Sequence, residues 1–507
     1  MGVVYFSIIP TFEPSRYCKC WIVCFYDNHK CMERKVQVMV ESLNKRIEEN
    51  ADKMIQSLCE VVQIPSVYGE PQPGAPFGKE SRRALQYAMD LGKKLGFETV
   101  VNVDDQVCYI EYGTGTKTVG VFAHLDVVPE GKGWTYPPFG GEIHNHRVYG
   151  RGTVDNKGPY IASLYALYAI KELGLPLGDW KIRIVGGTNE EKGMEDMKHY
   201  VEKCGAPDAG FTPDGLYPMS FTERVINYYF MSYPLTDPST GKVKVVSLKG
   251  GNILNMVPDE AEAVLLAVDE EEAKKTAEAI AEYSKITGRD LTAEVDGKKI
   301  TIHSKGLCAH SCTPFNGKNA IVAILMFLAE QKLGGSIGKF LDFFKEKIGM
   351  TTDGSLMGMA RADECGKLTF SLSKMEIEEN MLKWVVNIRL PYTYKDEVTA
   401  DWKAQIEPVG IKIDDMDLHK SYRFPLDHPL ITTLRTVYEE LTGKDSTPSY
   451  EGGTYAQAVP NIVPFGSIFP GTPDLCHRPD ECIEIDEYIL DAKLFGNAMY
   501  ALTQNCK

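Results

Sequence analysis

The sequence predicts an α/β domain with a mainly parallel sheet, interrupted by an inserted α+β domain. The α/β domain is indicated by buried-strand runs, "TVGVFAHLDVVP" and "WKIRIVGGTNEE", that alternate with helical patterns, an order typical of parallel sheets. The insertion is indicated near Arg224, after which several strand-like runs follow one another until the first pattern returns beyond about Phe424. Surface loops tolerate inserted domains, so this is the simplest arrangement.

Helices of the α/β domain are predicted where apolar residues recur at helical spacing. This spacing extends over residues 41–62, 81–97 and 156–175, and over 486–504 near the end of the chain. In the segment 156–175, one apolar face is formed by Ile161, Leu164, Leu167 and Ile170. We expect that face to pack against the predicted sheet.

The inserted domain is predicted to consist of two related, ferredoxin-like halves. Strand-like runs between residues 226 and 268 precede a charged helix at 269–286, and the pair Asp296–Gly297 marks a hairpin. A similar order of strand, helix and strand returns over 383–422. We therefore expect these segments: a poorly ordered extension at 1–33, the α/β domain at 34–223 and 422–507, and the inserted domain at 224–421.

Composition argues against nucleic acid and membranes as partners. The 507 residues carry 55 basic and 70 acidic side chains, and the net charge of −15 disfavours binding to nucleic acid or anionic lipid. No run of 18 apolar residues occurs, so we expect no membrane span. The 13 cysteines are odd in number and follow no framework spacing, which favours a reducing cytoplasm. A zinc-binding tail is the alternative for the extension, through Cys18, Cys20, Cys24 and Cys31.

Histidine and carboxylate side chains follow the predicted strands of the α/β domain where each strand ends. They are His124, Asp126, Asp155, Glu190, Glu191, Asp214 and His477. The carboxyl ends of parallel strands meet at one edge of a sheet, where such domains bind ligands. Each residue alone has an ordinary explanation, such as a helix cap or a loop side chain. Together they favour a site for two divalent metals such as Zn or Mn.

Glu190 and Glu191 are adjacent, and side chains that are adjacent on a strand point to opposite faces. Both can serve one site only after the chain has left the strand. One glutamate can then bind a metal while its neighbour acts as general base toward a water bound there. We expect the pair to divide these two roles.

Four motifs occur in order and with consistent spacing: "FAHLDVVPEGKGWTYPPFGGEI", "RVYGRGTVDNKGP", "GGTNEEKGMEDMKHY" and "PDGLYP". Together they resemble the M20 metallopeptidases, and most closely the PepV-type dipeptidases. The resemblance extends from about residue 40 to the C-terminus. It implies a zinc-peptidase-like catalytic domain, with the inserted domain as a lid.

The resemblance implies a pair of zinc ions, for which Mn or Co could substitute. Asp155 would bridge the two ions. His124 and Asp214 would complete one metal site. Glu191 and His477 would complete the other.

The resemblance also implies roles for residues that do not bind metal. Glu190 would be the general base and would later protonate the leaving amine. Asp126 would orient His124, as metal-bound imidazoles usually require. A cis peptide bond is implied between Asp155 and Asn156.

The lid would bind the substrate. His310 in "CAHSCTP" would polarise the scissile carbonyl and its oxyanion. Asn255 in "GNILNMVPDEAEAVL" would lie on a lid strand at the substrate. Arg389 in "VVNIRLP" would bind the C-terminal carboxylate, for which a bidentate guanidinium is suited. The segment "YEGGTYA" resembles a glycine-rich substrate loop and adds Gly452, Gly453 and Thr454.

These expectations describe a zinc-dependent dipeptidase that hydrolyses dipeptides with a free C-terminal carboxylate through a metal-bound hydroxide. The insertion is long enough for the doubled lid of PepV-type enzymes, which implies that His310 acts within its own chain. We therefore expect a cytoplasmic monomer, with a homodimer as the alternative. The rival functions are an M20 N-acyl amino-acid deacylase or carboxypeptidase, and a non-catalytic zinc-binding protein on a peptidase scaffold.

Two other features look like metal sites but are predicted to be ordinary. The "HNH" segment at 144–146 is predicted to occupy a turn. Three cysteines next to the predicted site histidines are predicted to be small buried residues: Cys308, Cys312 and Cys476.

Overall fold

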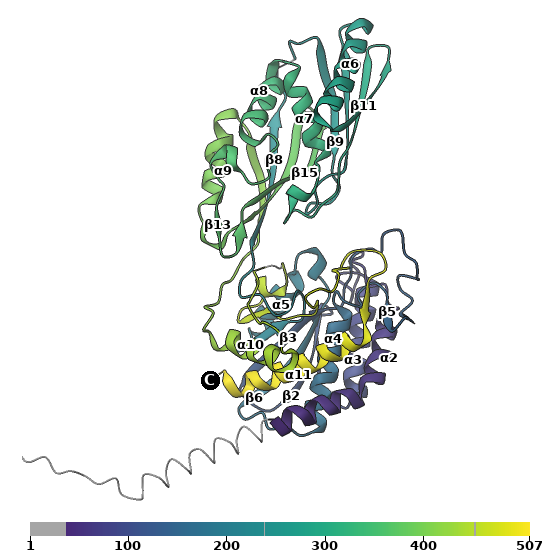
Figure 1. Ribbon diagram of the computed structural model, residues 1–507, viewed down its shortest axis with the longest axis vertical. Helices are drawn as coiled ribbons and strands as arrows, with labels where there is room; N and C mark the ends of the chain where they lie inside the picture. Colours follow the sequence, from purple (N-terminus) through teal and green to yellow (C-terminus); the bar gives the residue numbers. More distant parts are fainter. Residues whose placement is uncertain (1–36, 238, 451–452, 507) are drawn as a thin grey trace, which may run out of the picture. The chain divides into compact units, whose positions relative to one another are not determined.

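The computed structural model describes residues 37–237, 239–450 and 453–506 (Figure 1). The predicted extension at 1–33, with its cysteines, and Gly452 lie outside these residues. The described residues form two compact units. The first contains the segments up to Lys192 and from Asp474 onward, and the second is Gly193–Pro473. The domain boundaries inferred from the sequence stay a prediction.

Four strands of the first unit form a mixed sheet. Their order is β1 (Thr99–Val103), β2 (Val107–Gly113), β6 (Trp180–Gly187) and β3 (Lys117–His124). β3 and β6 are parallel, whereas β2 is antiparallel to both of its neighbours. His124 ends β3, and Glu190 and Glu191 follow β6. Because the two strands are parallel, their carboxyl ends and these residues lie at the same edge of the sheet. Asp155 follows β5 (Arg147–Tyr149), outside this pair.

The helices of the first unit are α2 (Ala51–Val62), α3 (Lys79–Lys94), α4 (Lys157–Glu172) and α11 (Ile485–Asn505). α4 contacts α2, α11 and both parallel strands, and its residues are buried along most of its length. A helix buried on all sides needs apolar residues all round, and α4 has them. The helix predicted over 41–62 is interrupted at Asn50, between a helical segment at 37–49 and α2.

A second, small sheet of the first unit has the order β19 (Cys482–Glu484), β5 (Arg147–Tyr149) and β4 (Glu142–His144). The "HNH" segment makes the turn between β4 and β5, where Asn145 and His146 have positive φ angles of 48° and 61°. The predicted turn is therefore confirmed.

The second unit contains an eight-stranded antiparallel sheet. Its order is β11 (Asp290–Asp296), β12 (Lys299–Lys305), β10 (Glu260–Ala267), β9 (Val243–Gly250), β15 (Thr369–Glu378), β16 (Met381–Leu390), β8 (Val225–Pro234) and β17 (Lys412–Leu418). Asp296 pairs with Lys299, so the predicted Asp-Gly hairpin is confirmed. The ferredoxin-like form of the two halves stays a prediction.

Helices pack on one face of this sheet, as Figure 1 shows. They are α6 (Glu270–Thr287), α7 (Ala320–Glu330), α8 (Gly335–Phe343) and α9 (Val398–Ile406). In β10 and β12 buried residues alternate with exposed or half-buried ones, the pattern of strands with one face on a core. Trp402 on α9 is fully buried in that core and packs edge-on against Phe370 of β15.

Outside this sheet, the second unit has a parallel pair of strands, β7 (Ala209–Thr212) and β18 (Ile462–Pro464). Two helices accompany it, α5 (Glu195–Cys204) and α10 (Pro429–Thr442). Backbone hydrogen bonds join segments that are far apart in sequence: the amide of Phe221 donates to Ser449 and that of Phe424 to Phe221. The chain entering the large sheet is thus tied to the chain leaving it.

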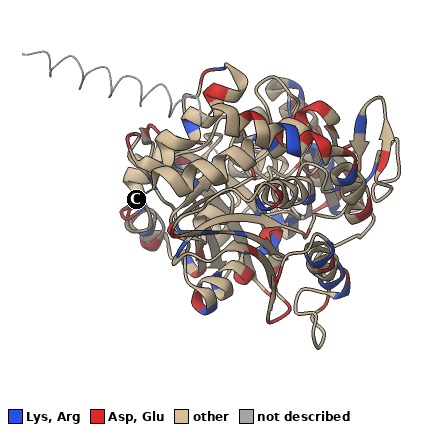
Figure 2. Cartoon of the chain, turned by 90° about the horizontal axis from the view of Figure 1, so that it is seen from below, with Lys and Arg blue, Asp and Glu red and all other residues tan. Residues whose placement is uncertain are grey.

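Acidic and basic residues are interspersed along the elements seen in Figure 2. Among the described helices, none alone has the length and hydropathy needed to cross a membrane; one bent pair, Ala320–Glu330 with Gly335–Ile348, meets these two criteria together.

Candidate functional site

The carboxylate of Asp155 lies between two imidazoles of the first unit. Its Oδ1 is 2.9 Å from Nε2 of His124, and its Oδ2 is 3.0 Å from Nε2 of His477. His124 is the last residue of β3 and is fully buried, whereas the side chain of His477 is about half exposed. Each oxygen of one carboxylate therefore faces a different histidine, which is the arrangement that a bridging ligand needs.

Glu191 joins the same cluster from the end of β6. Its carboxylate oxygens lie 3.1 and 3.2 Å from Nε2 of His477. The strand ends at Gly187, and η1 (Glu190–Lys192) begins three residues later. Because the chain has left the strand, Glu190 and Glu191 no longer need to point to opposite faces.

Asp126 fixes both ends of this arrangement. Its backbone carbonyl accepts a hydrogen bond from Nδ1 of His124 at 2.9 Å, which leaves Nε2 as the ligand atom. Its carboxylate lies farther from that ring, at 3.6 Å, and instead accepts the amide N–H groups of Glu190 and Glu191 at 3.3 and 3.1 Å. The backbone of Asp126 thus orients the histidine, and its side chain holds the turn that carries the two glutamates.

Glu481 organises the loop that carries Asp155. One of its carboxylate oxygens accepts the amides of Gly152, Val154 and Asp155 at 3.0, 3.0 and 3.2 Å. The other oxygen accepts from Arg151 at 2.6 Å, and both side chains are buried. Sequence reasoning missed Glu481, since it follows no strand and belongs to no motif. The peptide bond between Asp155 and Asn156 is cis, as predicted.

The electrostatics of the cluster favour a positive charge. Burial lowers the pKa of His477, but hydrogen bonds to Asp155 and Glu191 outweigh burial and raise it to about 11. Burial acts in the opposite sense on Asp155, and the hydrogen bonds with His124 and His477 outweigh it, so its pKa lies below the usual range. The carboxylates therefore attract either a proton on the imidazole or a metal ion, which compete for the same nitrogen.

The donor set fits a divalent metal. Asp155, Glu191 and His477 offer ligand atoms that all lie within 4.8 Å of one another, and mixed imidazole and carboxylate ligands suit Zn or Mn. A second group, His146 with Glu484 and Asp486, also lies within that distance. His146 and Asp486 are exposed there, and exposed groups of this kind are common without a metal.

The second unit brings His310 and Arg389 together. Nη2 of Arg389, on β16, is 3.2 Å from Nε2 of His310, and Nδ1 of that ring is 2.8 Å from the sulfur of Cys312. Asn255 lies in a turn between β9 and β10 and not on a strand as predicted, and its backbone carbonyl accepts the amide of Ser311 at 2.8 Å. Three residues predicted to bind substrate thus come from segments that contact one another.

Arg389 is buried, with 6% of its surface exposed. Its Nε has no hydrogen-bond partner among the described residues. Burial lowers its pKa, and the hydroxyl of Tyr228 acts in the opposite sense. A buried guanidinium with a spare N–H donor is suited to bind a carboxylate.

Thr454, from the predicted substrate loop, is held by a buried glutamate. Its hydroxyl lies 2.8 Å from Oε1 of Glu223, and its amide donates to Oε2 at 3.4 Å. Gly453 lies beside Ile226, because a Cβ on that glycine would be 3.4 Å from the side chain of Ile226. Sequence reasoning missed Glu223, which precedes β8 without belonging to a recognised motif.

Asp214, the remaining predicted ligand, follows β7 in the second unit, and its role stays a prediction. The predicted burial of the three cysteines is wrong: Cys308 is exposed, and Cys312 and Cys476 are half-buried. Cys308 and Cys312 lie on a segment between β12 and α7, and connecting segments usually run over the surface of a protein.

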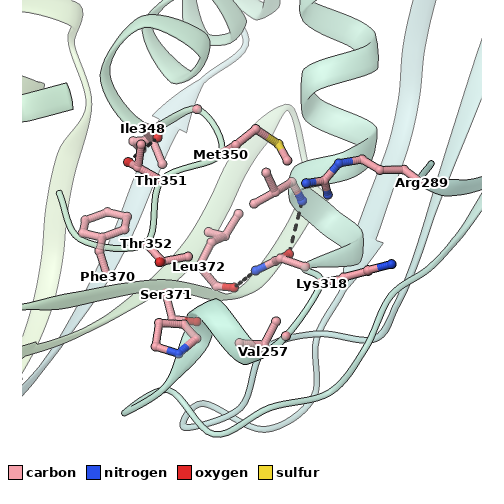
Figure 3. A pocket seen from close by; sticks show the side chains of 15 residues that line it. Val257, Arg289, Lys318, Ile348, Met350, Thr351, Thr352, Phe370, Ser371 and Leu372 are labelled. Atoms are coloured by element: carbon pink, nitrogen blue, oxygen red, sulfur yellow. Dashed lines mark hydrogen bonds between the residues drawn. The ribbon is translucent and has the colours of Figure 1, made fainter. Parts of the chain in front are cut away.

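A separate pocket lies in the second unit, between β15 and the start of α7 (Figure 3). Phe370 and Leu372 line it, and the guanidinium of Arg289 points into it. None of the residues predicted for the catalytic or substrate site lines this pocket. It is therefore distinct from the cluster around His310 and Arg389.

The cluster of histidines and carboxylates lies where two parallel strands end. Such clusters are typical of metal-dependent hydrolases. The chain belongs to the peptidase family M20/M25/M40, whose family model matches residues 120–501. The resemblance seen in the sequence motifs is thereby confirmed, and the protein is a hydrolase of this peptidase family.

Relatives of known name cover most of the chain. The Bacillus subtilis (strain 168) protein YtjP, named as a candidate dipeptidase, is 34% identical over 462 residues, which is 89% of this chain and 98% of that protein. A Staphylococcus epidermidis (strain ATCC 12228 / FDA PCI 1200) protein, also named as a candidate dipeptidase, is 30% identical over 470 residues, or 90% of this chain and 98% of its own length.

Solved structures share the fold at low sequence identity. Human carnosine dipeptidase 1 aligns with a TM-score of 0.53 and 18% identity, over 92% of this chain and 100% of that one. The dipeptidase Dug1p of Saccharomyces cerevisiae aligns with a TM-score of 0.54 and 14% identity, over 92% and 98% of the two chains. At this identity the similarity concerns the fold alone.

Proposed function

We propose that the protein is a two-zinc dipeptidase that hydrolyses dipeptides with a free C-terminal carboxylate. The observation that carries this proposal is the position of Asp155, whose two carboxylate oxygens face His124 and His477 separately, at 2.9 and 3.0 Å. Relatives more than a quarter identical over nine-tenths of the chain carry dipeptidase names, which favours dipeptides over other substrates.

The proposed metal ligands are His124, Asp155, Glu191, Asp214 and His477. A pair of divalent ions, when bound, supplies a water with a pKa near 7 and polarises the scissile carbonyl. Glu190 would take the proton of that water and deliver it to the leaving amine. Its backbone, anchored on Asp126, directs it to the same edge as Glu191.

The second unit would supply the groups that bind the substrate. His310 would donate a hydrogen bond to the carbonyl oxygen as negative charge develops there. Arg389 would bind the terminal carboxylate, for which its unpartnered Nε is available. Asn255, Gly453 and Thr454 would line the same site.

The contact between Arg389 and His310 suggests a rule for substrate length. If one residue binds the carboxylate while its neighbour polarises the carbonyl, the distance between those two substrate groups is fixed. This distance selects the peptide bond next to the C-terminal residue, which is the one peptide bond of a dipeptide. We propose in addition that the lid, closed over the bound carboxylate, has room for a single residue before this bond and so excludes tripeptides and longer peptides.

Steady-state kinetics on Ala-Ala, Ala-Ala-Ala and Ala-Ala-Ala-Ala would test this rule. We expect kcat/KM to fall at least about tenfold from Ala-Ala to Ala-Ala-Ala and to stay low for Ala-Ala-Ala-Ala, because a longer peptide that fits only by moving its carboxylate loses a contact worth about 1.4 kcal/mol or more. Equal values for all three peptides would contradict the proposal. Glu190→Ala protein from the same purification controls for contaminating peptidases.

An N-acyl amino-acid deacylase or carboxypeptidase would share the metal ligands and differ at the substrate's other end. Acetyl-alanine, an N-acyl substrate with a carboxylate, separates these alternatives from the dipeptidase. Hydrolysis of acetyl-alanine faster than Ala-Ala would favour the deacylase. Metal binding without hydrolysis of any of these compounds would favour a binding protein.

A further inference from the structure

Glu223 is a buried carboxyl group that the proposed reaction does not use. It is fully buried just before β8, and its two oxygens face one residue of the substrate loop. Oε1 lies 2.8 Å from the hydroxyl of Thr454, and Oε2 accepts the amide of Thr454 at 3.4 Å. The side chain of Gln457 provides a further hydrogen bond.

The protonation state of Glu223 decides what the hydroxyl of Thr454 can do. A threonine hydroxyl has one proton and two acceptor lone pairs. The amide of Ala456 already donates to this oxygen at 3.2 Å. If Glu223 is ionised, the hydroxyl proton is committed to Glu223. If Glu223 is neutral, its own proton is donated to Thr454, and the hydroxyl proton is free for another acceptor.

The surroundings of Glu223 favour the neutral form near neutral pH. Burial raises its pKa to about 8, although the hydrogen bonds from Thr454 and Gln457 act in the opposite sense. Three titratable groups on neighbouring segments interact with Glu223 electrostatically: the charge of Asp214 also raises the pKa of Glu223, and Glu223 in turn raises the pKa of Tyr422 and of Arg389.

Thr454 lies close to the guanidinium proposed to bind the substrate's carboxylate. Gly453, the preceding residue, lies beside Ile226, and Ile226 is paired with Arg389 between β8 and β16. Interaction between the charges of Glu223 and Arg389 independently indicates that they are near each other. A second donor at this position would complement the guanidinium.

We propose that Glu223 is a positioning residue, which in its neutral form donates to the hydroxyl of Thr454 and so frees the proton of that hydroxyl for the carboxylate of the bound peptide. This inference rests on the proposed function, because it needs a substrate with a free carboxylate. Ionisation of Glu223 withdraws the donor and places a negative charge near that of the substrate. Binding of the carboxylate therefore weakens as the pH rises through the pKa of Glu223.

The test is the affinity for Ala-Ala and for its amide between pH 7 and pH 9, as KM and as Kd in the Glu190→Ala background. One unit above its pKa, about a tenth of a carboxyl group is neutral, so the ratio of the two affinities should fall up to about tenfold by pH 9. Titration of the substrate's amine is common to both ligands and cancels in this ratio.

Glu223→Gln keeps a donor toward the hydroxyl of Thr454 and an acceptor for its amide but cannot ionise. We expect its affinity ratio to stay constant within about twofold over the same range, with kcat changed less than KM. Thr454→Val lacks the hydroxyl, so its affinity for Ala-Ala should be weak and should not change with pH. Thr454→Ser keeps a hydroxyl and should show the wild-type pH profile. Asp196→Asn is the matched control, because Asp196 is another buried carboxyl group that holds this loop, through the hydroxyl of Tyr455 at 2.6 Å; it should keep the wild-type pH dependence.

If Glu223→Gln shows the same pH dependence as the wild-type protein, or if Thr454→Val retains wild-type affinity, the positioning role is refuted while the proposed function stands. If the wild-type protein neither binds nor cleaves Ala-Ala, the proposed function fails and this inference fails with it. If Glu223→Gln protein does not fold, the pH profiles of Thr454→Val, Thr454→Ser and the wild-type protein decide the question.

Discussion

Glu190 and Glu191 are adjacent in the sequence, and the proposed reaction gives them different tasks. Glu191 faces the imidazole of His477, and the backbone amides of both glutamates donate to the carboxylate of Asp126. A carboxylate that binds a metal cannot also accept a proton easily, because the metal holds its charge. Two adjacent carboxylates can divide the two tasks.

Replacement of Glu190 by alanine tests this division. We expect Glu190→Ala to retain its metals, because the ligand cluster around Asp155 is untouched, and to lose about 10²- to 10⁴-fold in kcat, the usual contribution of a general base. Metal content by mass spectrometry and kcat on Ala-Ala are the measurements. Glu191→Ala is the matched control and should lose metal. A Glu190→Ala protein with near wild-type kcat would exclude this residue as the base.

At the scale of secondary-structure elements, the loop that follows β5 depends on Glu481. This one carboxylate satisfies three backbone amides between Gly152 and Asp155 and the guanidinium of Arg151. Burial raises the pKa of Glu481, and the charge of Asp155 acts in the same sense, while Arg151 lowers it. The loop carries Asp155, so Glu481 supports both the conformation of the loop and the proposed metal site.

Removal of that support should be costly for stability. We expect Glu481→Ala to lower the free energy of unfolding by about 3–5 kcal/mol, since it leaves a buried guanidinium without its partner. Urea unfolding of the single variants and of Arg151→Met/Glu481→Ala gives the coupling energy. The double variant should be less destabilised than the sum of the single variants. Additive effects would show that the pair does not act as a unit.

Elements with a strong local pattern were predictable from the sequence, and supports formed by distant residues were not. β3, β6 and α4 follow from apolar runs and helical spacing, because each buries its own residues against a neighbour. The antiparallel position of β2 has no such signal, since strand direction depends on pairing with β6. Glu481 and Glu223 act through backbone groups far along the chain, so their roles require the folded arrangement.

The site residues show the same contrast. His124 and Asp155 belong to two separate motifs, and their positions after predicted strands predicted that they lie close together; the structure places Oδ1 of Asp155 2.9 Å from Nε2 of His124. The contact of Arg389 with His310, 79 positions away in the chain, was implied only by resemblance to a family. A motif indicates local geometry. Contacts formed by the packing of a sheet cannot be predicted from the order of residues along the chain.

At the scale of the whole molecule, the proposed reaction draws on residues of both units. Glu190 belongs to the first and His310 to the second. The sequence predicts that both act within one chain, and mixing two inactive variants tests this directly. Glu190→Ala and His310→Ala proteins, each inactive alone, should stay inactive when unfolded together and refolded as an equimolar mixture, since neither chain has both residues.

If His310 instead acted on the partner's site in a symmetric dimer, half of the dimers would be mixed and about a quarter of all sites would contain both residues. Activity near that level, together with a dimeric mass by light scattering, would overturn the prediction. Wild-type protein refolded under the same conditions should recover full activity. If it does and the mixture of variants stays inactive, each chain supplies its own His310.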